Sequence, residues 1–216
     1  MNAVIQLVIA IAMLGMAGML LFLNFWRAVL FFFPDSVRVR PVAPGDAMGL
    51  PLALTPLASQ LRALGFVPLG AHEEKPRFRR ATRAYDFAHP TERAFATLHF
   101  AADGKPRLYL LTPLAPEGFV LTFGYPRPGF EVPGRYRSGG LAETSPERLL
   151  RAHQERLQGL VPTEDFSQDA RLRAGQAWYR GPGQKEIRRQ NVQGVLWTVV
   201  ALAIVASLFL GGGRST

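Results

Sequence analysis

The chain has 216 residues and a mass of 23.8 kDa, a length at which one folded domain with a few additional elements is expected. Its formal net charge is +9, and it contains no cysteine, which excludes disulfide bonds, cysteine-ligated zinc and a thiol nucleophile. The apolar residues are concentrated at the two ends, and every Asp and Glu lies between them. This segregation is typical of a membrane protein with a water-soluble insert.

The first apolar run spans residues 3–33 and is longer than a bilayer requires. A hydrocarbon core of about 30 Å needs about 20 helical residues. We therefore expect the helix to leave the hydrocarbon at Trp26 and Arg27, an interfacial aromatic residue and a cation whose long side chain extends to the headgroups. Residues 28–33 would then lie along the membrane surface, and Pro34 would end the helix. A cleaved signal peptide is the alternative, but the run is too long and no Lys or Arg precedes it.

The second apolar run spans residues 192–210 and carries no charge. It also has the length of a transmembrane helix, and we expect this helix to begin after a Gly-Pro-Gly break at residues 181–183. The expected organisation is a first transmembrane helix with an interfacial extension, a linker rich in Pro and Gly, a soluble domain, and a second transmembrane helix with a short tail. The predicted boundaries are 1–33, 34–50, 51–183 and 184–216.

The distribution of cations predicts the orientation of the two helices in the membrane. Lys and Arg are concentrated on the side of each apolar run that faces the middle of the chain, and Arg214 is the only one on the far sides. The positive-inside rule then places the soluble domain in the cytoplasm and both termini outside. We expect the location to be a bacterial inner membrane. The residues predicted to lie at the membrane interface are Trp26, Arg27, Lys185, Arg188 and Arg189.

Turn residues and alternating apolar residues predict an α+β fold for the soluble domain. Thr55 and Ser145 are expected to cap two helices, and a third helix is expected to start after Ser167. Between the first two caps lie five segments with strand patterns, of which residues 119–125 show the strongest alternation, and residues 126–140 are expected to form a loop. We therefore expect an antiparallel meander sheet of four or five strands with flanking helices. The five segments are residues 66–69, 78–87, 94–100, 107–111 and 119–125.

The histidines are the first candidates for chemistry. Residues 72–74, His-Glu-Glu, contain metal-ligand types, but adjacent residues converge poorly on one ion, and a solvated turn is the commoner explanation. His99 on a strand and His153 on the apolar side of a helix would meet if that helix packed on the sheet, although packed histidines are commoner than ligands in such positions. His89 precedes a proline and indicates only a loop.

The sequence lacks the short motifs that would indicate a reaction. It contains no HExxH zinc motif, no Gly-x-Ser-x-Gly nucleophile motif and no Walker phosphate-binding motif. We therefore predict no catalytic residue, no cofactor and no metal site, and whether the chain is an enzyme stays undecided.

A basic stretch is the best binding signal in the chain. Its spacing fits a solvated strand that turns its arginines to water, which is the commonest explanation. Anionic lipid headgroups or an acidic protein partner are the second explanation. Nucleic acid, on whose bases the interleaved Phe78 and Tyr85 could stack, is the least favoured. The residues of this predicted anion-binding patch are Lys75, Arg77, Arg79, Arg80 and Arg83.

These patterns favour a non-catalytic interaction or scaffolding module, anchored in the lipid bilayer at the cytoplasmic membrane face. One alternative is a membrane-surface enzyme that uses residues such as Glu73, His99 or His153. Another is an accessory subunit of a transporter or secretion assembly. A protein partner or a second copy of the chain in the membrane is also open. The small residues Ala203 and Ser207 would allow the two apolar helices to pack closely together.

Overall fold

The chain forms two units. The computed structural model describes residues 3–42, 49–142 and 144–211. One unit, called the helical unit here, consists of Met1–Ser36 together with Gln184–Thr216, and the other, called the domain, is Val37–Gly183. The two ends of the sequence therefore belong to one unit, and the middle folds separately.

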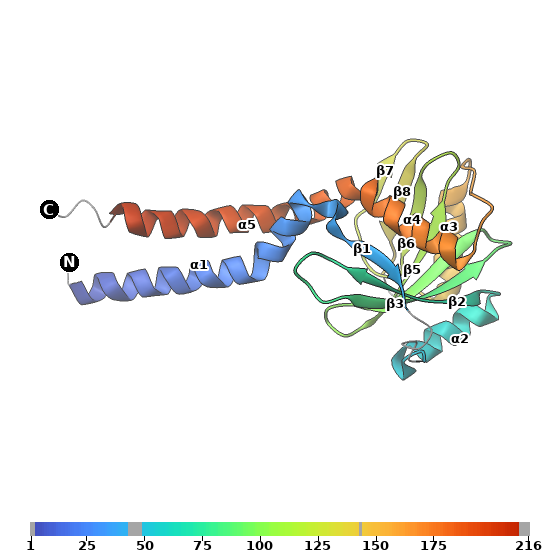
Figure 1. Cartoon of the computed structure of the whole chain (residues 1–216), viewed down its shortest axis with the longest axis horizontal. Coiled ribbons are helices and arrows are strands. Elements are labelled where there is room, and N and C mark those ends of the chain that lie inside the picture. The colour runs from blue at the N-terminus through green and yellow to red at the C-terminus, as the bar shows by residue number, and fades with distance from the viewer. Residues whose placement is uncertain (1–2, 43–48, 143, 212–216) are drawn as a thin grey trace. The chain divides into compact units, whose positions relative to one another are not determined.

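Two long apolar helices make up most of the helical unit. They are α1, Ala3–Phe32, and α5, Gly183–Gly211, and a short 3-10 turn, η1, Pro34–Ser36, follows α1 (Figure 1). Both helices are long and apolar enough to cross a membrane. Only 6% of the most apolar 18-residue window of α1 and 11% of that of α5 are buried, so these side chains do not form a protein core. α1 continues without a break through residues 28–32, which we expected to lie along the membrane surface.

α1 and α5 contact each other through backbone and small residues. Arg27 Nη2 donates a hydrogen bond to the carbonyl oxygen of Gln190 at 3.3 Å, and Arg188 Nε donates one to the carbonyl oxygen of Phe31 at 3.3 Å. Gly194 allows the close approach, because a Cβ at this position would overlap the side chain of Arg27. The end of α1 therefore packs against the start of α5.

The domain contains one mixed sheet of eight strands in the order β1-β2-β3-β4-β5-β6-β8-β7. Strands β1 to β6 are joined by antiparallel pairing, β8 runs parallel to β6, and β7 pairs antiparallel with β8 at the far edge. The strands are β1 (Arg38–Pro41), β2 (Val67–Lys75), β3 (Thr82–His89), β4 (Ala94–Phe100), β5 (Pro106–Pro113), β6 (Phe119–Phe123), β7 (Phe130–Val132) and β8 (Tyr136–Gly140).

The α+β class is confirmed, but the predicted antiparallel meander of four or five strands is wrong, because the sheet has eight strands and is mixed. β1 lies within residues 34–50, for which we predicted a linker, and residues 43–48 of that segment lie outside the described residues. β7 and β8 lie within residues 126–140, for which we predicted a loop. These short edge segments are strands because of their pairing with neighbouring strands, and local composition does not reveal such pairing.

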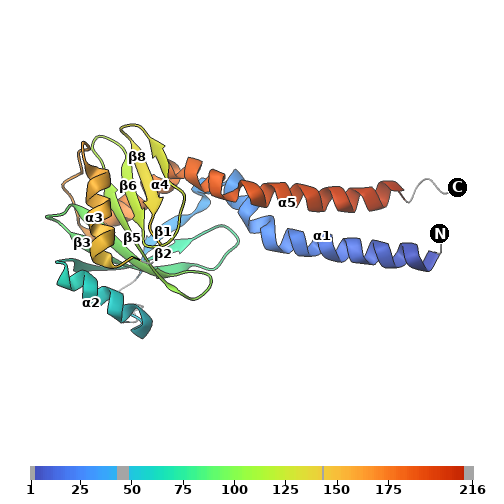
Figure 2. The same ribbon diagram turned by 180° about the vertical axis from the view of Figure 1, so that it is seen from behind.

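Helices cover both faces of the sheet. α2 (Thr55–Ala63), preceded by the 3-10 turn η3 (Leu52–Leu54), and α3 (Pro146–Leu157) lie on one face, and α4 (Gln168–Arg180) lies on the other (Figures 1 and 2). Ser145 caps α3 as predicted, and α4 starts after Ser167 as predicted, with Ser167 as its cap. The hydroxyl oxygens of both serines accept hydrogen bonds from backbone N–H groups in the first helical turn. Thr55 is the first residue of α2 and does not cap it.

Alternation along the strands gives the two faces of the sheet different side chains. The face under α2 and α3 carries the main apolar core, which includes Leu61, Leu98, Leu110 and Leu149. Successive strand side chains point to opposite faces, so Thr97, next to Leu98, faces α4. The α4 face carries the buried ionisable strand residues His72 and Asp86.

α4 contacts strands from both ends of the sheet. Gln176 Nε2 donates a hydrogen bond to the carbonyl oxygen of Val39 on β1, and Trp178 Nε1 donates one to the hydroxyl of Tyr136 on β8, each at 3.0 Å. Five strands lie between β1 and β8 in the sheet order. The curled sheet therefore holds α4 in its concave face, and this arrangement creates the candidate site.

Candidate functional site

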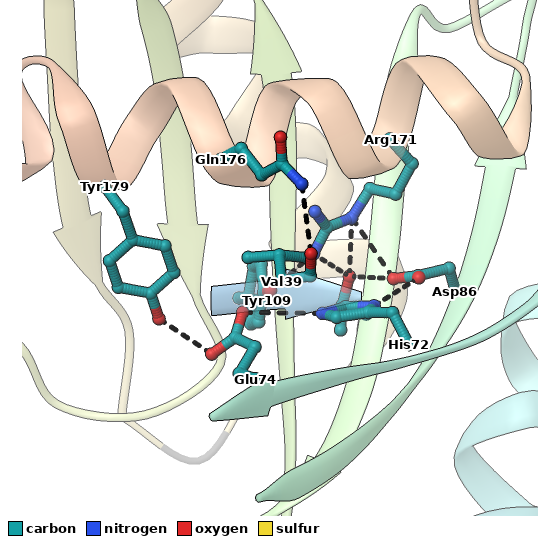
Figure 3. Close-up of polar contacts among 9 residues, drawn as sticks. Val39, His72, Glu74, Asp86, Tyr109, Arg171, Gln176 and Tyr179 are labelled. Carbon is teal, nitrogen blue, oxygen red and sulfur yellow. Dashed lines mark hydrogen bonds and ion pairs between the residues drawn. The ribbon is translucent and has the colours of Figure 1, made fainter. Parts of the chain in front are cut away.

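Four ionisable side chains form a buried network between α4 and the sheet (Figure 3). His72 Nδ1 lies 2.5 Å from Asp86 Oδ2, and its other ring nitrogen lies 3.4 Å from Glu74 Oε1. Arg171 Nε lies 3.1 Å from Asp86 Oδ1. The side chains of His72, Asp86 and Arg171 are at most 1% exposed, and that of Glu74 is 26% exposed. We call these four residues the ionic network.

Strand register explains how residues so distant in sequence meet. Asp86 on β3 is directly opposite Thr97 on β4, and Thr97 is directly opposite Tyr109 on β5, so the three side chains form a row across the sheet. The Thr97 hydroxyl donates a hydrogen bond to Asp86 Oδ1 at 2.7 Å. On β2, His72 and Glu74 are two residues apart and therefore face the same side as this row.

Arg171 extends from α4 onto this row. Its Nε and Nη2 atoms donate hydrogen bonds to the Thr97 hydroxyl at 3.2 and 3.0 Å, and Nη2 donates to the Tyr109 hydroxyl at 2.6 Å. Gly175, one turn further along α4, leaves the guanidinium room, since a Cβ there would lie 3.0 Å from Arg171 Nη1. The same helix face provides Tyr179, whose hydroxyl donates to Glu74 Oε2 at 2.7 Å.

The position of His72 between two carboxylates fixes its protonation. Both ring nitrogens face carboxylate oxygens, which accept but cannot donate while ionised. Burial alone would lower the pKa of His72, but the charge of Asp86 and the hydrogen bonds to Asp86 and Glu74 raise it above its ordinary value. His72 is therefore an imidazolium at neutral pH, and two cations balance two carboxylates in the ionic network.

The pKa values of the two carboxyl groups, Asp86 and Glu74, are lowered, whereas that of His72 is raised. Burial would raise the pKa of Asp86, but Arg171 and His72 hold it below its ordinary value. Burial would likewise raise the pKa of Glu74, but its hydrogen bond to His72 and the charge of that ring lower it to about 2. Both carboxylates remain ionised at neutral pH, which is the state that their buried partners require.

A cavity of about 120 Å³ borders the ionic network on the α4 side of the sheet. Leu111, Leu121, Phe123 and Trp178 supply its apolar wall. Two buried polar atoms of its lining, His99 Nδ1 and Arg171 Nη1, have no hydrogen-bond partner within the described part of the chain. Burial lowers the pKa of His99, so its ring is neutral. The cavity therefore has both apolar and polar residues in its lining, with the guanidinium of Arg171 and the carboxylate of Glu74 among the polar ones.

The arrangement is better suited to holding charge than to moving it. The guanidinium of Arg171 already contacts Asp86, Thr97 and Tyr109. The Thr97 hydroxyl donates its hydrogen bond to Asp86, so no neutral base is available to activate Thr97 as a nucleophile. His72 is fully buried, which prevents direct proton exchange with solvent. Among the described residues, no group of three or more His, Asp and Glu side chains could hold a metal ion.

The histidines have other positions than the sequence suggested. Residues 72–74 lie on β2 and His72 is buried, so the predicted solvated turn is wrong. His153 lies on α3, on the opposite face of the sheet from His99, and its ring nitrogens face the hydroxyls of Thr112 and Thr122, each at 2.9 Å. Burial lowers the pKa of His153 to about 3, so it is a neutral, structural histidine. His99 and His153 therefore do not meet.

The predicted binding residues are placed in two separate regions. Trp26 and Arg27 lie in α1, and Lys185, Arg188 and Arg189 lie in α5. The basic patch lies at the β2–β3 connection. Lys75 ends β2, Arg77, Arg79 and Arg80 lie in the turn, and Arg83 on β3 forms an ion pair with Glu73 at 3.3 Å. Residues 78–81 are therefore part of a turn and not of the strand that we predicted over 78–87.

Comparisons with known proteins give no assignment for this site. No family model matches the chain, and neither a curated protein nor a solved structure matches it.

We expect Asp86→Asn to destabilise the domain by about 3–5 kcal/mol, because Arg171 and His72 would remain buried without their shared counter-ion. Glu131→Gln is the matched control, since Glu131 pairs with Arg137 at the surface and such pairs contribute about 0–1 kcal/mol. Chemical unfolding of the full chain in detergent, followed by tryptophan fluorescence, measures both. Equal, small effects of the two changes would show that the ionic network does not hold α4 on the sheet.

The free energy of unfolding of the domain should be greatest between pH 4.5 and 6.5, the ordinary pKa values of glutamate and histidine. The lowered pKa values of Asp86 and Glu74 mean that their stabilisation is present above their ordinary values and is lost as the pH falls through the folded values. The raised pKa of His72 means that its stabilisation is complete below 6.5 and is lost as the pH rises through the folded value.

Unfolding experiments at a series of pH values test this dependence. In His72→Gln, the loss of stability on the alkaline side should disappear, while the loss on the acid side should remain. An alkaline decline of the same size in the variant would assign it to another group.

Proposed function

We propose that the chain is an integral membrane protein in which two spanning helices hold an α+β interaction domain at the cytoplasmic face of a bacterial inner membrane. The observation that carries this proposal is the pair of long apolar helices, α1 and α5, whose side chains are not buried by the rest of the described chain. A helix that is apolar all round needs an apolar environment, and a bilayer supplies one.

The contacts between α1 and α5 support the view that α1 is retained in the mature protein. Arg27 and Arg188 each bind the backbone of the opposite helix, and Gly194 has no side chain at the place where Arg27 packs. A cleaved signal peptide does not need a complementary partner at the other end of the chain. A pair of spanning helices does, because helices in lipid associate through small residues and polar contacts.

The chemistry of the domain supports interaction rather than catalysis. The ionic network pairs its charges with one another, and its most buried members have no access to solvent. A domain fixed at both ends has a high effective concentration toward its neighbours in the membrane. Docking to such a neighbour, to a second copy of the chain or to the membrane surface needs no reactive group.

The α4 cavity favours a second candidate function, the binding of a small molecule. Its polar lining includes the neutral ring of His99 and the carboxylate of Glu74 beside the guanidinium of Arg171. Trp178 also lines the cavity, so its fluorescence should report occupancy. This candidate replaces the alternative of an enzyme that uses His99 together with His153, because those two residues lie on opposite faces of the sheet.

Single cysteines test the proposed orientation, since the chain contains none of its own. Leu52→Cys places the thiol at a side chain that is 90% exposed in the domain. In intact spheroplasts, a membrane-impermeant maleimide should leave this thiol unmodified and should react with it after lysis, because the positive-inside rule places the domain in the cytoplasm. A phosphatase fused after Thr216 should be active in intact cells. Labelling of Leu52→Cys from outside, with an inactive fusion, would reverse the topology.

A further inference from the structure

The turn between β2 and β3, residues 76–81, combines exposed cations with one exposed aromatic side chain. Phe78 is 78% exposed and has a backbone φ of 61°, a left-handed conformation that a bulky residue rarely adopts. Arg77 lies over its ring, with the guanidinium carbon 5.7 Å from the ring centroid. The turn therefore presents a phenylalanine ring to solvent next to positive charge, and segments that lie at a membrane surface combine Lys and Arg with Phe, Trp or Leu in this way.

A groove of about 590 Å³ lies beside this aromatic ring. Its charged lining consists of four cations and one carboxylate, and the carboxylate, Glu73, pairs with Arg83. Guanidinium and ammonium groups are the usual partners of phosphate oxygens, and arginine binds them through a fixed pair of donors. The groove thus has the charge and the donor types that an anionic phosphate requires. Its cations are Arg40, Lys75, Arg79 and Arg80.

Strand register and chain length limit how far the start of this turn can lie from the end of α1. Arg38, the first residue of β1, pairs with Lys75, the last residue of β2, so the turn begins where β1 begins. Only residues 33–37 lie between α1 and β1, and so short a segment can span at most about 20 Å. This limit follows from the covalent chain and holds for any orientation of the domain.

We propose that the β2–β3 turn binds the anionic phosphate headgroups of the membrane, with Phe78 entering the interfacial layer and the groove cations contacting the phosphates. The inference rests on the proposed function, because α1 must end at a membrane surface for the turn to meet one. A lipid surface is favoured over nucleic acid, since Phe78 is the one aromatic residue of the turn and a single-stranded nucleic acid would stack on several.

Full-length protein in lipid vesicles tests the proposal. Ala81→Cys, in the groove lining, and Leu52→Cys, on η3, each carry the same environment-sensitive fluorophore, and both leave Phe78 in place. The vesicles are phosphatidylcholine alone or an equimolar mixture with phosphatidylglycerol. In the mixture, the label at position 81 should shift to shorter wavelength and lose emission with brominated acyl chains, whereas the label at position 52 should do neither. High salt should reverse the shift.

Two variants separate the roles of charge and ring. Lys75→Gln/Arg79→Gln/Arg80→Gln should abolish the dependence on phosphatidylglycerol, and Phe78→Ser should abolish quenching by brominated lipid while the phosphatidylglycerol dependence remains. The same emission at positions 81 and 52 in both vesicle types would overturn the proposal and leave a solvated turn. A shift at position 81 that appears only on addition of RNA or polyglutamate would overturn it in favour of those partners.

Flotation of the vesicles after an alkaline wash distinguishes this inference from the proposed function. Protein that floats with both vesicle types while the label at position 81 stays in water contradicts only the headgroup site. Protein that fails to float with either vesicle type contradicts the spanning helices as well.

Discussion

Apolar side chains that the protein does not bury are the constraint on which the rest of the structure depends. Along α1 and α5, residues such as Leu7, Phe22, Leu196 and Phe209 are each at least 59% exposed. Leaving one large apolar side chain in water costs about 1.5–3 kcal/mol relative to burying it, and these helices repeat that cost along their length. In the proposed bilayer, lipid would remove this cost, and it would also account for why the two ends of the sequence form a unit apart from the domain that lies between them.

In the domain, charged residues attach one helix, α4, to the curled sheet. α4 contacts β1 through Gln176, β8 through Trp178 and the middle strands through Arg171. Burying a guanidinium is costly unless its charge and its donors are matched. Asp86 supplies the opposite charge, and Thr97 and Tyr109 accept hydrogen bonds from the guanidinium. The positive charge of His72 and the negative charge of Glu74 balance each other. The network gives α4 one position on the sheet, which an apolar interface alone would define less sharply.

Local signals in the sequence predicted the elements that depend on local physics. The two apolar helices follow from length and composition, and the cap at Ser145 and the start of α4 after Ser167 follow from hydroxyls placed before helical patterns. β1, β7 and β8 were missed because three to five residues carry too little periodicity, and pairing with distant strands decides their conformation. The parallel pairing of β6 with β8 likewise depends on long-range register.

The ionic network could not be assembled from the sequence, because His72, Asp86 and Arg171 become neighbours only through strand register and the docking of α4. Two local features of the sequence nevertheless point to a buried ionic network. Asp86 stands between two aromatic residues, Tyr85 and Phe87, in a segment predicted to be a strand, and a carboxylate buried in such a position requires a buried cation. Arg171 lies in a helix next to alanine and glycine residues. The small size of these residues leaves room for the long arginine side chain between the helix and the sheet.

Alkaline carbonate extraction of membranes from cells that express the full chain tests the central claim most directly. This treatment releases proteins held at a membrane surface by charge and leaves spanning helices in the bilayer. The account predicts that the protein stays in the membrane pellet after extraction and enters the supernatant only with detergent. Complete release into the carbonate supernatant without detergent would contradict it.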